Sequence, residues 1–136
     1  MTPHVTTHRL RFNDTDRLGH INNAVFAVML EQGRSELLVE CGFPVDAGTH
    51  SVVIVRLELD FLAEMSWPGD VRIETEVKRL GTRSFTFAQR LLSAGTLCGQ
   101  AETVLVVMDR TARKAVPIDP WRPALIPWFA PSTDDP

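Results

Sequence analysis

Two aspartates and a histidine lie close together in a polar stretch near the start of the chain. The stretch reads Phe12-Asn13-Asp14-Thr15-Asp16-Arg17-Leu18-Gly19-His20-Ile21-Asn22-Asn23, and an apolar run over 24–30 follows it. Because Asn is a favoured N-cap residue, this pattern predicts a helix that begins near Asn22 or Asn23. Carboxylates and an imidazole would then lie beside the free backbone N–H groups of a helix N-terminus. Such a combination is suited to chemistry at a carbonyl group.

The same stretch resembles the hotdog-fold acyl-CoA thioesterases of the 4-hydroxybenzoyl-CoA thioesterase family. The usual pattern of that family is D-x-D, then after two residues G-H-x-N-N, an aromatic residue and E-x-x-R. The matching segments here are Asp14-Thr15-Asp16, Gly19-His20-Ile21-Asn22-Asn23, Phe26, and Glu31-Gln32-Gly33-Arg34. Looser similarity continues through Asp60-Phe61, Pro68-Gly69-Asp70, Gly81-Thr82-Arg83-Ser84 and Met108-Asp109-Arg110. Phe26 stands where the family often has Tyr, and Gly33 where Ala is common.

The resemblance implies hydrolysis of an acyl-CoA thioester to a free acid and coenzyme A. It assigns the catalytic carboxylate to Asp16, as either nucleophile or general base toward the thioester carbonyl. Backbone N–H groups near Asn23 would stabilise the developing oxyanion. The thiolate leaving group has a pKa of about 8.5 by analogy with free Cys, so its departure needs little help from an acid. His20, Asn22 and Asn23 are expected to contact the substrate or to hold the loop.

Residues outside the loop are further candidates for substrate contacts. Arg83 and Ser84 match a turn that lies near the thioester in the family, which implies a role in substrate binding. The candidates for an acyl pocket are Phe26, Met29, Phe61 and Phe85, and each of them is equally well explained as plain core. The basic residues available for the phosphates of coenzyme A are Arg79, Arg83, Arg90, Arg110, Arg113 and Lys114.

Two other carboxylates, Asp14 and Glu31, are better explained by structural roles than by catalysis. The sequence also leaves open an alternative function to thioester hydrolysis. Asp14 is expected to order a turn by accepting hydrogen bonds from nearby backbone N–H groups. Some hotdog thioesterases carry the catalytic carboxylate on the helix, where Glu31 lies, but its spacing to Arg34 suits an ion pair. The alternative function is a non-catalytic acyl-CoA-binding or scaffold protein, because a fold does not determine activity. The presence of Asp16 within the full loop pattern favours the enzyme.

The loop is followed by the predicted helix, and the spacing of apolar residues in the sequence indicates which face of that helix is buried. We expect the helix to end before Gly42. One face would carry Phe26, Met29, Leu30, Gly33, Leu37 and Cys41, and the opposite side Glu31, Arg34 and Ser35. Gly33 costs about 1 kcal/mol relative to Ala inside a helix. Either a strand or ligand approaches the helix closely there, or the glycine is simply tolerated.

Alternating side chains predict the strands that pack against this helix. A first strand over 8–12 would lead into the loop, and later strands are expected over 53–61, 71–78, 85–91 and 101–108. In the segment 53–61, one face would carry Val53, Val55, Leu57, Leu59 and Phe61, and the other Ile54, Arg56, Glu58 and Asp60. Turns containing Gly81 and Gly95 predict an antiparallel meander. The expected fold class is therefore α+β, a long antiparallel curved sheet wrapped around one central helix, which the resemblance identifies as the hotdog fold.

The whole chain sets limits on its class. Its 136 residues, 44% of them hydrophobic, fit one domain, expected over 1–130, with a disordered tail over 131–136. A short helix with Asp119 as cap and Pro120 at its first position is expected before that tail.

A net charge of −3 argues against a nucleic-acid binder. The two cysteines are too few for a disulfide framework, and no leader or membrane span is recognisable, so we expect a cytoplasmic protein.

The expected partners are the acyl-CoA substrate and further copies of the chain. A domain of this size often gains stability by pairing. The resemblance implies a homodimer or a tetramer of dimers, with Asp16 from one subunit and part of the coenzyme A contact from its neighbour. No pair of His or Cys residues has the spacing of zinc ligands, and coenzyme A is part of the substrate, so neither a metal nor a separate cofactor is expected.

Overall fold

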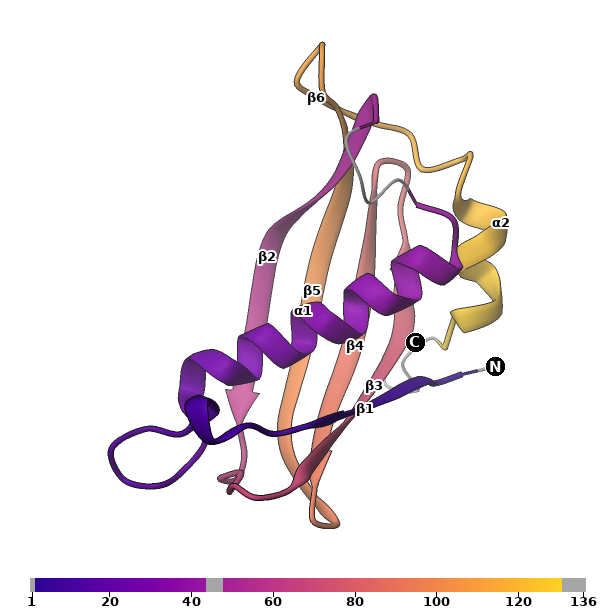
Figure 1. The fold of residues 1–136 in the computed structure, drawn as a ribbon. Coiled ribbons are helices and arrows are strands. Elements are labelled where there is room, and N and C mark those ends of the chain that lie inside the picture. Colours follow the sequence, from indigo (N-terminus) through magenta and orange to yellow (C-terminus); the bar gives the residue numbers. More distant parts are fainter. Residues whose placement is uncertain (1, 44–47, 131–136) are drawn as a thin grey trace.

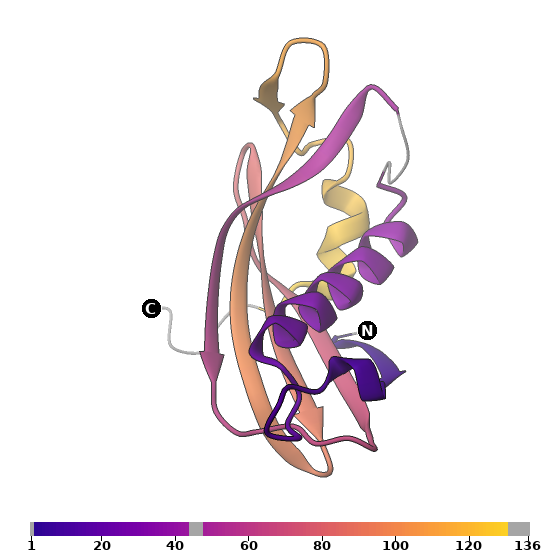
Figure 2. The ribbon, with the colours of Figure 1, turned by 60° about the vertical axis from the view of Figure 1, so that its left-hand side comes forward.

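One long helix, α1 (Asn23–Glu40), lies across the concave face of a curved antiparallel sheet (Figures 1 and 2). The computed structural model describes residues 2–43 and 48–130. The strands are β1 (His4–Arg9), β2 (His50–Phe61), β3 (Asp70–Leu80), β4 (Ser84–Ser93), β5 (Thr96–Asp109) and β6 (Lys114–Val116). This confirms the predicted α+β hotdog fold.

The sheet leaves strand β2 on its edge. The strand order is β1-β3-β4-β5-β2, and the short β6 pairs with the end of β5. Along β5, His50 of β2 lies opposite Asp109 and Phe61 lies opposite Gly99. The two long hairpins β3–β4 and β4–β5 form the predicted meander, so the later strands follow the alternation of the sequence.

Both ends of α1 are fixed by the residues that predicted them. The Asn22 side chain accepts a hydrogen bond from the Ala24 N–H at 2.9 Å, which makes it the N-cap. At the other end the chain passes through Gly42, whose φ is +75°. The Gly42 N–H donates to Val39 O and the Phe43 N–H donates to Leu38 O, which is a Schellman ending.

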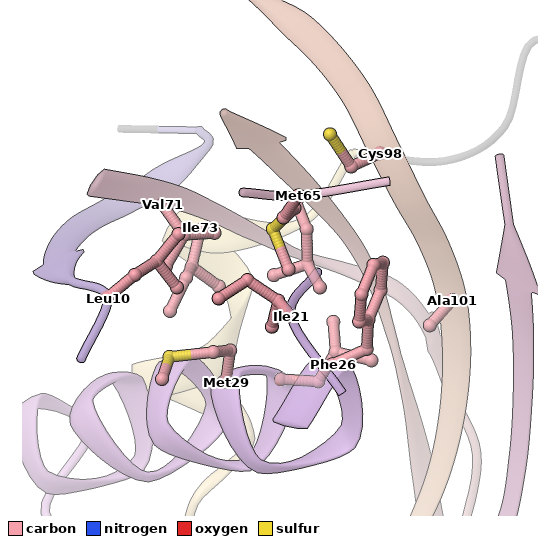
Figure 3. Close-up of a cluster of buried hydrophobic side chains, with 11 residues drawn as sticks. Leu10, Ile21, Phe26, Met29, Met65, Val71, Ile73, Cys98 and Ala101 are labelled. Atoms are coloured by element: carbon pink, nitrogen blue, oxygen red, sulfur yellow. The ribbon is translucent and has the colours of Figure 1, made fainter. Parts of the chain in front are cut away.

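Apolar side chains fill the space between α1 and the sheet in two clusters. The cluster around the N-terminal half of the helix contains Phe26, Met29 and Ile73 (Figure 3). The cluster around the C-terminal half contains Leu37 and Phe85 and is covered by the segment that follows β6. The helix therefore lies on core along its whole length, and its first turn is held firmly against the sheet.

Arg34 was expected on the solvent side of the helix, and the structure places it in the core, where only 6% of the residue is exposed. Its guanidinium Nη1 donates to Gln89 Oε1 at 3.3 Å and to Thr103 Oγ1 at 3.4 Å. Position 34 flanks the apolar stripe, so a long side chain there reaches polar groups on the sheet. Burial lowers the pKa of Arg34, and the nearby charge of Glu31 offsets this only in part.

Two strand predictions need correction. The first strand spans His4–Arg9 instead of 8–12, because the chain leaves the sheet where the buried Leu10 donates its N–H to Gly69 O. In β2, a bulge between Ile54 and Arg56 shifts the alternation. Val53 therefore faces away from α1 opposite Val106, whereas Leu57 lies opposite the buried Thr103 on the helix side.

The C-terminal segment contains one short helix, α2 (Arg122–Leu125), followed by a 3₁₀ turn over Ile126–Trp128. Its N-cap is Trp121 and not Asp119 as predicted. The Asp119 carboxylate instead pairs with Arg122 Nε at 3.5 Å. The expected tail lies outside the described residues. Within the described part of the chain, no helix is both long and apolar enough to cross a membrane.

Candidate active site

The polar loop between β1 and α1 is closed by its own backbone hydrogen bonds. The Asp16 N–H donates to His20 O at 2.8 Å, and the Asn22 N–H donates to Asp14 O at 2.8 Å. Gly19 has a φ of +83°, a conformation that side chains with a Cβ rarely adopt. The Ile21 N–H donates to Met65 O at 2.8 Å and so ties the loop to the segment after β2. These bonds hold the loop in a fixed position next to the first turn of the helix.

Asp14 has the turn-ordering role expected from the sequence. Its carboxylate is buried and accepts hydrogen bonds from the Arg11 N–H at 2.7 Å and from Arg11 Nη2 at 3.0 Å. Burial raises the pKa of Asp14, but the hydrogen bonds and charge of Arg11 outweigh it and hold that pKa below its usual value. Both carboxylate oxygens are thus occupied within the loop, which leaves Asp14 no access to a substrate.

Asp16, two residues later, has an exposed side chain. Its Oδ1 accepts hydrogen bonds from the Leu18 N–H at 2.8 Å and the His20 N–H at 3.2 Å. No described residue donates to its Oδ2, so this oxygen is available to a water molecule or a carbonyl carbon. The two N–H bonds fix the direction of the carboxylate without using its second oxygen.

The start of α1 offers a free hydrogen-bond donor on a residue that lines the same cleft as Asp16. The Ala24 N–H is taken by the Asn22 side chain and the Val25 N–H by Asn22 O. The Asn23 N–H, in contrast, has no acceptor among residues 2–43 and 48–130. A free N–H at a helix N-terminus is well suited to stabilise a developing negative charge.

A cleft of about 430 Å³ joins these groups. Its lining residues are Asp16, Leu18, His20, Ile21, Asn23, Phe26, Phe61, Leu62, Ala63 and Glu64. The rings of Phe26 and Phe61 are tilted against each other with centroids 5.1 Å apart. Gly99 leaves room for the Phe26 ring, since a Cβ there would lie 3.2 Å from Phe26 Cδ2. Figure 3 shows Ile21 and Phe26 pointing into the same space above the helix.

Glu64 lines this cleft and was missed by the sequence analysis. Its Oε2 lies 3.1 Å from His20 Nε2. The contact forms because His20 and Ser66 are bridged as in an antiparallel pair, which brings two distant segments together. No local spacing in the sequence could indicate this bridge, and the only signal was the position of Glu64 soon after the predicted strand over 53–61.

The structure brings together five of the predicted site residues and not the others. Asp16, His20, Asn23, Phe26 and Phe61 line the cleft, and Asn22 caps the helix beside it. The remaining candidates, Met29, Phe85, Arg83 and Ser84, are not among the lining residues.

The positions of these remaining candidates differ. Met29 and Phe85 are buried in the two core clusters. Ser84 lies opposite Val106 and Phe61 opposite Gly99, so the turn with Arg83 and Ser84 is about 23 Å from the cleft along the sheet. Glu31 is exposed on the helix and lies outside the cleft lining. Among the described residues, no group of three His, Cys, Asp or Glu side chains could hold a metal ion.

The arrangement can activate a carbonyl group. Asp16, with one carboxylate oxygen unbonded, and Asn23, with its free backbone N–H, line one cleft together with apolar side chains. A carboxylate and an N–H donor are the groups that acyl transfer to water uses. The lining combines four polar residues with apolar ones that include Ile21, Phe26 and Phe61, so the cleft offers both kinds of contact to an acyl group.

Comparisons with known proteins point to the same chemistry. The family model of the thioesterase-like superfamily matches residues 10–129. The acyl-CoA thioester hydrolase YbgC of Escherichia coli is 27% identical over 105 residues, which cover 74% of this chain and 78% of the relative. A predicted thioesterase from Bacillus stearothermophilus is 27% identical, with a TM-score of 0.87 over 96% of this chain and 98% of that chain. The 1,4-dihydroxy-2-naphthoyl-CoA thioesterase from Synechocystis, 18% identical, shares the fold with a TM-score of 0.82 over 98% of this chain and 99% of that chain.

Proposed function

The chain belongs to the thioesterase-like superfamily and is a thioester hydrolase, and we propose that its substrate is an acyl-CoA and its catalytic carboxylate Asp16. The observation that carries this proposal is that Asp16, with its Oδ2 unbonded, and Asn23, whose N–H has no acceptor among the described residues, line the same cleft as several apolar side chains. The products are the free acid and coenzyme A. Coenzyme A is thus part of the substrate, and the proposed reaction uses no separate cofactor.

Two routes of hydrolysis agree with this geometry. As a general base, Asp16 takes a proton from a water molecule whose oxygen attacks the thioester carbon, and collapse of the tetrahedral intermediate releases the thiolate. As a nucleophile, Asp16 attacks that carbon itself, expels the thiolate and forms an anhydride that water then hydrolyses. In both routes the carbonyl oxygen becomes negative next to the Asn23 N–H. The bonds to Asp16 Oδ1 orient the carboxylate in either case.

We further propose that a second copy of the chain completes the site by pairing along β2. Among residues 2–43 and 48–130, no strand pairs with the outer edge of β2, and this strand exposes several apolar side chains, among them Ile54, Leu57 and Phe61. An open edge with apolar side chains is a template for another strand. Pairing of two β2 strands would cover both the edge and these side chains.

Such pairing would also bring cations to the cleft. The cleft lies at the Phe61 end of β2, whereas the β5–β6 turn lies beyond the His50 end, where His50 pairs with Asp109. A two-fold axis through an antiparallel β2 pair reverses the second sheet, so that the turn of one copy approaches the cleft of the other. The exposed basic residues Arg110, Arg113 and Lys114 of that turn are the ones we assign to the phosphates of coenzyme A.

The function is tested by the release of free thiol from acyl-CoAs with short, medium, long and aromatic acyl groups. The wild type should hydrolyse at least one of them, and Asp16→Asn should lower kcat by about a hundredfold or more while folding and assembly are kept. Asp119→Asn, which changes an exposed aspartate far from the cleft, is the matched control and should keep full activity.

Two results would overturn the assignment. Retained activity in Asp16→Asn would show that Asp16 is not the catalytic carboxylate. Binding of acyl-CoA without turnover of any thioester would favour the non-catalytic acyl-CoA-binding or scaffold protein.

A further inference from the structure

The Asp, Glu, Lys and Arg side chains that line the cleft are all of one kind, namely acidic. Its ten lining residues include two carboxylates, Asp16 and Glu64, but neither a Lys nor an Arg. The other lining groups are one imidazole, one amide and six apolar side chains. A carboxylate carries negative charge and offers only hydrogen-bond acceptors. Within the lining of a single copy, an anionic group therefore meets two carboxylates and neither Lys nor Arg.

Glu64 lies where it would act on the acyl tail. The reacting carbonyl would lie between Asp16 and the Asn23 N–H, and the tail would continue over Phe26 and Phe61. Glu64 follows these rings in the segment after β2 and lines the same cleft. Its Oε2 lies 3.1 Å from Nε2 of His20, a second lining residue, and its side chain is 71% exposed.

From this distribution we infer that the enzyme selects acyl groups that are uncharged and apolar, and rejects those that end in a carboxylate. The inference rests on the proposed acyl-CoA hydrolysis and specifies its substrate class. The phosphates of coenzyme A lie at the opposite end of the substrate from the acyl tail. Cations that bind these phosphates therefore do not neutralise Glu64.

The size of the effect follows from Coulomb's law. Because Glu64 is largely exposed, water screens it, and two like charges about 6 Å apart then change a rate by roughly threefold to tenfold. This repulsion acts on ground state and transition state alike, so it should appear in kcat/KM.

The test compares two acyl-CoAs with the same five-carbon chain, pentanoyl-CoA and glutaryl-CoA. We expect kcat/KM to be at least about threefold lower for glutaryl-CoA. The thioester of glutaric acid monomethyl ester, which has a similar size to glutaryl but no charge, controls for chain bulk and should be hydrolysed much faster than glutaryl-CoA.

Substitution of Glu64 assigns the discrimination to this residue. Glu64→Gln should lower the pentanoyl to glutaryl ratio of kcat/KM by about threefold to tenfold, and Glu64→Lys should lower it further. The matched control is Glu36→Gln, because Glu36 forms the same kind of pair, with its Oε2 3.1 Å from His8 Nε2, but lies outside the cleft. That variant should leave the ratio unchanged.

The outcomes separate this inference from the proposed function. Equal kcat/KM for the two thioesters in the wild type would overturn the inference and leave acyl-CoA hydrolysis standing. A wild-type ratio that persists in Glu64→Lys would also overturn it. No turnover of either thioester, nor of any other acyl-CoA, would overturn the proposed function and the inference with it.

Discussion

Two aspartates only two residues apart have different tasks because different donors surround them. The Asp14 carboxylate accepts hydrogen bonds through both of its oxygens from Arg11, and it is buried. Asp16 is bonded through one oxygen only and has its other oxygen open to the cleft. A loop that uses one carboxylate for its own geometry can present the second in a fixed direction.

The first prediction at this scale concerns Asp14→Asn. Because the pKa of Asp14 lies below its usual value of 3.8, the ionised carboxyl stabilises the fold above that pH and loses this effect as the pH falls through its folded pKa. At about pH 7 the variant should have a free energy of unfolding lower by about 1–3 kcal/mol. At about pH 3 the difference from the wild type should be much smaller.

Urea unfolding of both proteins across this pH range measures the effect. Asp70→Asn, which changes an exposed aspartate outside β2, should give a difference near zero at every pH. A stability loss in Asp14→Asn that stays constant down to low pH would contradict the role given to the carboxylate.

Residue spacing brought together the candidate site residues of the loop before α1, but it did not indicate those that come from distant segments. Asp16, His20 and Asn23 lie within one short loop, so their proximity follows from chain connectivity alone. Glu64 lies far along the chain and reaches His20 only through a bridge formed in the folded state. Arg34 was assigned to the solvent side from its spacing on the helix, while its partners Gln89 and Thr103 come from two separate strands.

Among the elements, α1 and β3 approach each other unusually closely at Gly33. A Cβ at this position would lie 2.5 Å from Ile73 Cγ2, 3.2 Å from Gln89 Nε2 and 3.3 Å from Thr75 Oγ1. Of the two explanations left open by the sequence, close approach of a strand is the one the structure supports. The glycine therefore sets the distance between the helix and the sheet.

The prediction for this element is that Gly33→Ala destabilises the protein. Ala improves helix propensity by about 1 kcal/mol. Overpacking against the buried Ile73 costs about 1–3 kcal/mol and should exceed that gain. Ser35→Ala, on the exposed side of α1, is the control and should change stability by less than about 0.5 kcal/mol. A Gly33→Ala protein more stable than the wild type in urea unfolding would show that the helix can move away from the sheet freely.

Element boundaries were predictable where a single residue type determines them. Asn22 and Gly42 mark the two ends of α1 through a cap and a left-handed residue, and both effects are local. The bulge in β2 depends on pairing with β5, so the alternation of the sequence alone placed Val53 and Ile54 on the wrong faces. The same limit applies to β1, whose end is set by a hydrogen bond to Gly69.

At the scale of the whole molecule, the prediction is that two copies pair along the edge strand β2. A substitution on this strand tests it. Leu57→Asp would place a charge in the proposed contact between two copies. Since Leu57 is already 37% exposed in one copy, the variant should fold, yet it should sediment as a monomer and lose activity by at least about tenfold. Val28→Asp, an exposed apolar position on the outer side of α1, should keep the β2 pairing and the activity.

Sedimentation and thiol release measured on the same samples decide this point. A fully active Leu57→Asp monomer would show that one copy carries the complete site. A wild type that is monomeric throughout the micromolar range would contradict the pairing directly.

The exposed apolar edge also has a consequence for the lifetime of the newly made chain. If two copies pair along β2 as proposed, a protomer that has not yet met its partner displays an exposed edge strand of the kind to which chaperones and aggregating chains bind. The time to that encounter shortens as the concentration of the protein rises. Cells that make little of this protein would therefore lose a larger fraction of it to degradation, so its abundance should rise more steeply than its rate of synthesis.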